Sequence, residues 1–273
     1  MRNVLLTVIA AIALSLAPSP ASAQTYVPGA AAAATRLGVD PQLIDDLVVA
    51  NRILAHEGIL DAYGHVSVRH PARPNHYLIA RSVAPEFVAA DDILEYDQDS
   101  NLVGPAEPRQ FIERYIHGEI YKARSDVQAV IHSHSPALVP FSVSSIPLRP
   151  VFHMAAFIAG GVPVWDSASA NDPEGQGILV RNSALGASLA ATLGNHPVAL
   201  MRGHGDVVAA RDLKAAVRNA IFLDANARMQ ATAIQLGGSI KYITPDEARA
   251  MLSGRGDPDR AWDYWRRRAL GLK

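Results

Sequence analysis

Two histidines separated by a single serine lie at positions 132 and 134, in the apolar segment QAVIHSHSP. The apolar residues before them predict a buried strand, and residues two apart in a strand point to the same side. The imidazoles of His132 and His134 are therefore expected to face one point. Such pairs commonly hold a divalent metal ion, and two hydrogen-bonded surface histidines are an equally open interpretation.

A helix is predicted directly before this strand. In RQFIERYIHGEIYKARSDV, apolar residues recur at helical spacing over about four turns. Glu113 and His117 are four residues apart, so they share one face of this helix. Glu113 is a candidate third ligand or general base, and the alternative is a solvated carboxylate on an exposed face.

A further histidine follows an apolar strand later in the chain. His204 stands between Gly203 and Gly205 in PVALMRGHGDVVAA, a pattern that predicts a hairpin. Glycines allow a sharp turn and a close approach of the backbone to a bound group. His204 is either a functional group at the end of a strand or incidental to a turn whose glycines serve geometry alone.

The elements expected to position these residues alternate between strands and helices. Asp40 and Pro41 are typical of a helix start, and Gly58 ends that helix. No repeat or low-complexity linker divides the 273 residues, which suits one domain with a full core. Strands are predicted at 65–69, 76–80, 129–134, 162–165, 197–201 and 206–210, and later helices at 182–193 and 213–236.

Several of these segments resemble the class II aldolase/adducin family. They are ERYIHGEIYKARSDVQAVIHSHSP, the later RGHG, and the earlier DAYGHVSVRHPARPNHYLIARS, and the likeness extends over residues 42–250. The resemblance implies a single α/β/α domain with a central mixed, mainly antiparallel sheet. It also implies a catalytic metal held by His132, His134 and His204, with Glu113 as a fourth ligand or as the catalytic acid/base.

The chain departs from the sugar-phosphate aldolases of that family where they bind phosphate. Those aldolases have small polar residues at the positions of Gly64-His65, Ala80-Arg81-Ser82-Val83 and Phe111-Ile112. Phe and Ile cannot donate hydrogen bonds to phosphate, whereas Arg suits the bidentate capture of a planar carboxylate. These replacements resemble a decarboxylase branch of the family that acts on hydroxylated aromatic or pyridine dicarboxylates.

The resemblance to this branch implies a set of pocket residues. Arg81, with Ser82, is expected to hold a substrate carboxylate, and either His65 or His153 is expected to protonate the carbanion. Arg81 and His65 are alternatively exposed loop residues. Members of the family are typically tetramers whose C-terminal residues complete the adjacent site. Tyr264 is the candidate for that role, and the alternative is a tail that packs on its own domain.

The composition limits the partners and the metal. A formal net charge of −1 provides no basic surface for nucleic acid or for a membrane. The absence of cysteine leaves nitrogen and oxygen donors, and one Zn²⁺ or Mn²⁺ ion per subunit is expected. The expected substrate is a small hydroxy-carboxylate, decarboxylated by a metal-dependent lyase. The alternatives are an aldolase or dehydratase acting on a non-phosphorylated hydroxy-carbonyl compound, a non-catalytic adducin-like module, and a metal-binding protein without chemistry.

The first residues have the pattern of a secretory signal peptide. Arg2 precedes an apolar run at 4–17, and Ala21-Ser22-Ala23 forms an A-x-A cleavage site. This run is too short for a membrane span, although a hydrophobic anchor is the alternative. We expect a signal peptide at 1–23 and a periplasmic or secreted mature protein. The remaining chain is expected to comprise a flexible leader at 24–39, the domain at 40–250 and a tail at 251–273.

Overall fold

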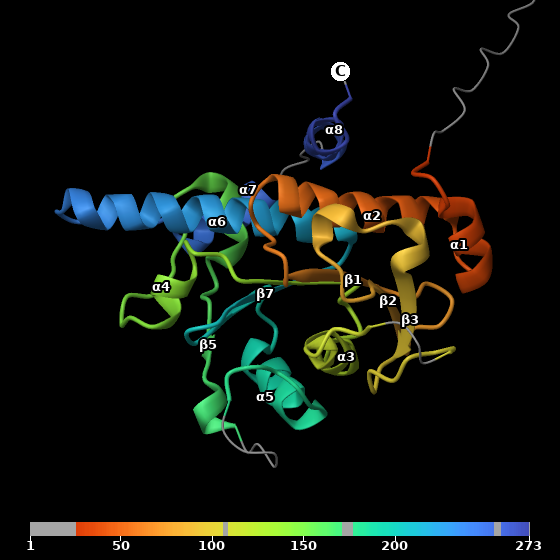
Figure 1. Ribbon diagram of the computed structural model, residues 1–273. Coiled ribbons are helices and arrows are strands. Elements are labelled where there is room, and N and C mark those ends of the chain that lie inside the picture. Colours follow the sequence, from red (N-terminus) through yellow and green to blue (C-terminus); the bar gives the residue numbers. More distant parts are fainter. Residues whose placement is uncertain (1–25, 106–108, 171–176, 254–257, 273) are drawn as a thin grey trace, which may run out of the picture.

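A seven-stranded sheet lies between two layers of helices in the computed structural model (Figure 1), which describes residues 26–105, 109–170, 177–253 and 258–272. The strand order is β3-β2-β1-β4-β7-β6-β5, and every pairing is antiparallel except that of β5 with β6. The predicted mixed, mainly antiparallel sheet is confirmed. The strands are β1 (His65–Arg69), β2 (His76–Ala80), β3 (Ile93–Asp97), β4 (Ala129–Ser133), β5 (Val164–Trp165), β6 (Val198–Met201) and β7 (Gly205–Ala210).

The helices cover both faces of the sheet, as the prediction of an α/β/α domain requires (Figure 1). One layer contains α1 (Ala30–Leu37), α2 (Pro41–His56), α6 (Leu213–Leu236) and α8 (Pro258–Ala269), and the other contains α3 (Arg114–Ala123) and α5 (Ser183–Leu193). The shorter helices are α4 (Val139–Ser142), α7 (Pro245–Leu252), η1 (Pro85–Phe87), η2 (Ala90–Asp92), η3 (His153–Ile158) and η4 (Ser167–Ser169).

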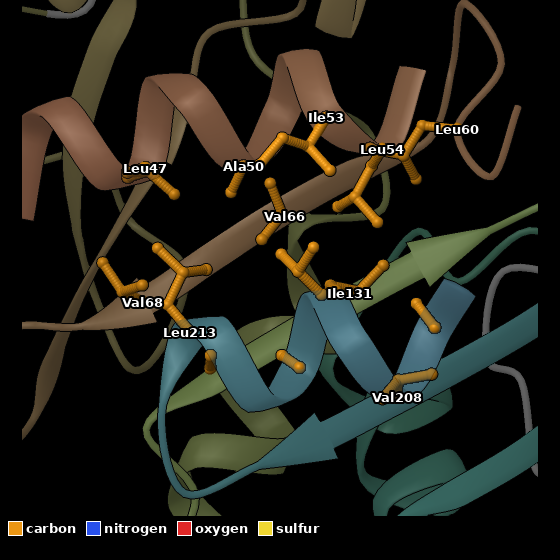
Figure 2. Packing of buried hydrophobic residues seen from close by; sticks show 14 of the residues in the cluster. Leu47, Ala50, Ile53, Leu54, Leu60, Val66, Val68, Ile131, Val208 and Leu213 are labelled. Carbon is orange, nitrogen blue, oxygen red and sulfur yellow. The ribbon is translucent and has the colours of Figure 1, made fainter. Parts of the chain in front are cut away.

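The alternation of side chains along β1 and β4 separates an apolar core from the polar site. Val66, Val68 and Ile131 point toward α2 and α6 and are buried in the larger hydrophobic cluster (Figure 2). His65 and His132 belong to the opposite face, because successive residues of a strand point to opposite sides of the sheet. The two strands thus contribute apolar side chains to one layer and histidines to the other.

The helix before β4 is shorter than predicted. It begins at Arg114, so Glu113 precedes its first turn rather than lying within it. Ile112, expected on the apolar face of a longer helix, is 60% exposed. The physical reason is a backbone hydrogen bond of 2.7 Å from Ser82 N to Arg109 O, which ties this stretch to the chain beyond β2.

The prediction of a flexible leader is wrong for residues 30–37. These residues form α1, which packs on α2 with its small apolar side chains buried. The run of alanines favours a helix and lets the two backbones approach closely. Val27 N also donates a 2.6 Å hydrogen bond to Asp45 of α2, so the ordered structure begins well before residue 40.

The C-terminal tail packs on its own domain through α8. Trp262 and Trp265 are buried in the larger hydrophobic cluster, and Arg266 forms a 2.6 Å ion pair with Asp45 of α2. The predicted domain boundaries of 40 and 250 are therefore too narrow at both ends. The predicted signal peptide at 1–23 lies outside the described residues, and none of the described helices combines the length and apolarity needed to span a membrane.

Candidate metal centre

Four side chains from distant parts of the sequence converge at one end of β4. The ligand atoms of Glu113, His132, His134 and His204 all lie within 4.8 Å of one another. His134 Nε2 is 3.2 Å from Nε2 of both His132 and His204. Glu113 Oε2 lies 3.5 Å from His132 Nε2 and 3.4 Å from His204 Nε2. All four residues predicted to surround a metal are thus brought together.

The pairing of β4 with β7 places His204 beside the two histidines of the HSH segment. His132 is paired with Val207 in this ladder, and His204 lies in the turn just before β7. Gly203 has a φ of 66°, which glycine adopts at low cost. A Cβ on Gly205 would collide with the carbonyl oxygen of Ser133. The glycines on either side of His204 therefore provide both the turn and the close approach of the strands.

Each imidazole is oriented by a hydrogen bond from its other ring nitrogen. His132 Nδ1 donates to the Asp206 carbonyl at 3.0 Å. His204 Nδ1 donates to the Ile178 carbonyl at 2.9 Å, and His134 Nδ1 to the Asp61 carboxylate at 3.0 Å. A carbonyl only accepts, so the proton of His132 and of His204 is on Nδ1. In the neutral rings, Nε2 then presents a lone pair to the centre, an arrangement typical of histidines that bind metal.

This arrangement of donors fits a divalent cation. Nε2 lone pairs 3.2 Å apart cannot form hydrogen bonds to one another, and a cation between them satisfies all three. Glu113 adds a negative charge: burial opposes its ionised form, but the neighbouring imidazoles of His132 and His204 outweigh burial and hold the pKa of this carboxyl well below the ordinary range. Val180 N donates to its other oxygen at 2.8 Å and fixes the carboxylate.

A cavity of about 570 Å³ opens beside the centre, with Glu113 and His134 in its wall. Much of the remaining wall is apolar, contributed by Phe111, Ile112 and Leu179 among others. His65 and Ser82 also line this cavity, as the sequence predicts. The phosphate-binding positions of the aldolases are thus occupied in part by hydrocarbon and aromatic side chains.

Arg81 does not line the cavity, contrary to its expected role. Its guanidinium Nε donates to Asp92 at 2.6 Å, which directs the side chain away from Ser82 and the cavity wall. A different arginine, Arg109, lines the cavity instead. Arg109 begins the segment predicted as a helix, and no role was expected for it.

His153 and Tyr264 also lie outside this cavity wall. His153 is exposed at the start of η3, a segment that packs on α6 and α7. Asn226 of α6 accepts hydrogen bonds from Val151 N and Phe152 N, which hold this segment against the helical layer opposite α3. Tyr264 is 56% exposed on α8. The expectation that His153 shares the pocket is therefore wrong for the single chain.

The sequence contains no clear signal for the groups that orient the three histidines through hydrogen bonds. The carbonyls of Asp206 and Ile178 orient two of the histidines, and any residue type can supply a backbone carbonyl. Asp61 is a recognisable hydrogen-bond acceptor, but nothing in its spacing connects it to His134, which lies 73 residues away in the chain. Only the fold brings these partners together.

Comparison with known proteins agrees with the fold. The sequence profile described as "Class II Aldolase and Adducin N-terminal domain" matches residues 45–231, and the chain belongs to this family. A relative from Talaromyces stipitatus, named decarboxylase tropJ, is 36% identical over 68% of this chain and 74% of its own length.

A second relative and a solved structure extend the comparison. A 3,4-dihydroxyphthalate decarboxylase from Arthrobacter keyseri is 32% identical over 81% of this chain and 90% of its own length. The crystal structure of an aldolase II superfamily protein from Pseudomonas syringae matches the fold with a TM-score of 0.71. The two are 23% identical, and the match covers 86% of this chain and 96% of that one. Decarboxylases and aldolases are both lyases, and the protein is an enzyme of this class.

Proposed function

We propose that the protein is a divalent-metal-dependent decarboxylase of a hydroxylated aromatic or heteroaromatic carboxylate. The observation that carries the proposal is the convergence of three imidazole Nε2 atoms and a carboxylate beside a largely apolar cavity. The names of the relatives from Talaromyces stipitatus and Arthrobacter keyseri support decarboxylation.

His132, His134, His204 and Glu113 would hold the cation, with Zn²⁺ or Mn²⁺ as the expected ions. A cation there supplies a Lewis acid that stabilises negative charge on a nearby substrate oxygen. The protein fixes the donors in advance, because each side chain is already restrained by a hydrogen bond to Asp61 or to the backbone.

The cavity supplies the contacts that select the substrate. Phe111, Ile112 and Leu179 offer apolar surface to a ring, and Arg109 offers a guanidinium to a carboxylate. Sugar phosphates instead require several donors for phosphate oxygens, which hydrocarbon side chains cannot provide. We therefore assign to Arg109 the substrate-binding role that the sequence suggested for Arg81, with Ser82 as a further donor.

In the proposed reaction the bond between the ring and the carboxylate carbon breaks. Its electron pair stays on the substrate, CO₂ leaves, and one proton from solvent takes its place on the ring carbon. Of the two imidazoles expected to serve the substrate, His65 lines the cavity and His153 does not. We propose that His65 donates a hydrogen bond to the substrate there.

Metal content and product analysis test this proposal. Purified protein should contain about one ion of Zn²⁺ or Mn²⁺ per subunit by elemental analysis, and His132→Ala should lose both the ion and turnover, because three ligands of this kind act as a set. Assays with hydroxylated aromatic diacids should release CO₂. Release of an aldehyde would favour an aldolase, a bound ion without turnover would favour a metal-binding protein, and full activity of a metal-free variant would contradict the scheme.

A further inference from the structure

A chain of hydrogen bonds leads from the cavity wall into the interior of the protein. His65 Nδ1 lies 2.6 Å from His117 Nε2, and His117 Nδ1 lies 2.6 Å from Ser67 Oγ. Ser67 Oγ in turn lies 2.8 Å from the Tyr121 hydroxyl. All four residues are at most 2% exposed, and only His65 lines the cavity.

The fold brings these four residues together through two regular spacings. His65 and Ser67 are two residues apart on β1, so they point to the same side of the sheet. His117 and Tyr121 are four residues apart on α3, so they share one face of that helix. The chain of hydrogen bonds therefore joins side chains of one strand and one helix.

The hydroxyl of Tyr121 sets the direction of the chain. Its described polar neighbours are Ser67 Oγ and the backbone N–H of Val130, and the N–H only donates. The phenolic hydrogen is satisfied only if it is donated to Ser67, since a buried unsatisfied donor costs about 1–3 kcal/mol. Ser67 then donates to His117 Nδ1, and His117 Nε2–H donates to His65 Nδ1. This leaves the single ring proton of His65 on Nε2.

We propose that His117, Ser67 and Tyr121 are positioning residues that fix the tautomer and ring plane of His65, so that His65 Nε2–H is a hydrogen-bond donor to a substrate oxygen in the cavity. The role of His65 in turnover rests on the proposed decarboxylase function, whereas the tautomer of His65 follows from the hydrogen bonds alone. His65 thus acts by stabilising negative charge on the substrate oxygen, as donors in an oxyanion hole do.

The charge state of His117 agrees with this arrangement. Burial is the main cause that lowers the pKa of His117 to about 3. His117 is therefore neutral near pH 7 and carries a single ring proton, as a chain of hydrogen bonds with one direction requires.

Nuclear magnetic resonance of the metal-loaded protein with ¹⁵N-labelled histidine reads the tautomer directly. We expect the pattern of an Nε2–H tautomer at His65 and at His117, assigned by comparison with His65→Gln and His117→Gln. An Nδ1–H tautomer at His65, or rapid exchange between the two forms, would overturn the proposal. This measurement needs no substrate, so its outcome is independent of whether the decarboxylase assignment is correct.

A matched pair of variants at position 117 tests the role in turnover. The amide of His117→Gln reaches toward the position of Nε2 and retains a donor for His65, whereas that of His117→Asn reaches only toward Ser67. With the diacid from which the enzyme releases CO₂ as substrate, we expect kcat of His117→Asn to fall about a hundredfold. We expect kcat of His117→Gln to stay within about fivefold of wild type. KM and metal content should be nearly unchanged in both variants.

Tyr77→Phe is the control for these variants. Tyr77 also stacks near His117, with ring centroids 6.1 Å apart, but its hydroxyl donates to Ser100 at 3.0 Å rather than to the chain. Its kcat should resemble wild type. Equal losses of kcat in His117→Asn and His117→Gln, or a loss of metal in step with kcat, would show a structural role for His117 only and would contradict the proposal.

Discussion

Three different groups hold the three imidazoles of the centre. His132 and His204 donate to backbone carbonyls, and His134 donates to a carboxylate that is itself half exposed. Asp61 is itself held by hydrogen bonds from Tyr63 N and Gly64 N. The partner of His134 is therefore the one acceptor of the three that a substitution can remove.

The chemical identity of the ligands was predictable from sequence, and their surroundings were not. The HSH spacing and the glycines around His204 marked candidate ligands, because strand alternation and turn geometry are local properties. Only the resemblance to the family joined these histidines with Glu113 in one metal site. The choice between Arg81 and Arg109 depends on where each side chain points. That direction is set by Asp92 for Arg81 and by the stretch tied to Ser82 for Arg109, both of which are tertiary contacts.

Arg109→Gln should raise KM for a hydroxylated aromatic diacid by about ten- to a hundredfold, since a hydrogen bond to a charged group contributes about 1.5–3 kcal/mol. The expected effect on kcat is smaller, because the contact is present in both the bound substrate and the transition state. Steady-state kinetics measure both parameters. Arg81→Gln is the matched control and should leave KM unchanged; the reverse pattern would restore Arg81 to the substrate site.

At the scale of elements, β1 and β4 determine the site. Their apolar residues fill the space under α2 and α6 (Figure 2), and the alternate residues contribute His132 to the metal centre and His65 and Ser67 to the buried chain of hydrogen bonds. Burying side chains such as Val66 and Ile131 stabilises the fold by about 1.5–3 kcal/mol each, which helps to hold the histidines on the opposite face.

Element boundaries were predicted well where caps are present. Asp40, Asn182 and Asp212 each accept a hydrogen bond in the first turn of the helix that they precede. The start of α3 has no such side-chain cap, and apolar residues continue past it into Phe111 and Ile112. The apolar periodicity predicted a longer helix, because the hydrogen bond that limits the helix comes from Ser82, which is distant in the sequence.

The burial of two tryptophans on α8 leads to a prediction about the stability that the C-terminal tail contributes. Trp262 is 4% exposed and packs in the larger core cluster, so Trp262→Ala should lower the free energy of unfolding by about 3–5 kcal/mol. Tyr264→Ala on the same helix should change it by less than about 0.5 kcal/mol, because that side chain is exposed. Denaturant unfolding of both variants measures the difference.

The activity of Tyr264→Ala tests whether the tail serves a neighbouring subunit. We propose that family-like tetramers form, and that Tyr264 then contacts the adjacent site. A lower kcat of Tyr264→Ala with unchanged stability would support that role. Wild-type kinetics would leave Tyr264 as an exposed surface residue and α8 as a helix that stabilises its own domain.

At the scale of the whole molecule, the first helix and the last helix of the domain both pack on α2. Helix α1 covers one part of α2 and α8 covers another, with Asp45 of α2 bonded to Val27 N and to Arg266 (Figure 1). The expected domain was shorter, because small alanines and a charged amphipathic tail do not stand out as core in a sequence. Their burial depends on packing against α2, a tertiary contact.

We propose that the protein is exported and that cleavage follows Ala23. When it is expressed with its own N-terminus in a bacterium, intact-mass analysis of the periplasmic fraction should show a chain that begins at Gln24. Ala23→Leu should block processing, because the A-x-A site requires a small residue there.

A chain made directly from Gln24 onward should fold, bind metal and turn over like the processed protein, because it keeps Tyr26, which packs against the core, and Val27, which bonds to Asp45 of α2. A chain that begins at Val39 lacks α1 and that contact, and its Tm should be several degrees lower, as the loss of a few kcal/mol predicts. Recovery of the unprocessed chain in the cytoplasm would contradict export. Equal Tm values for the two shortened chains would show that α1 adds no stability.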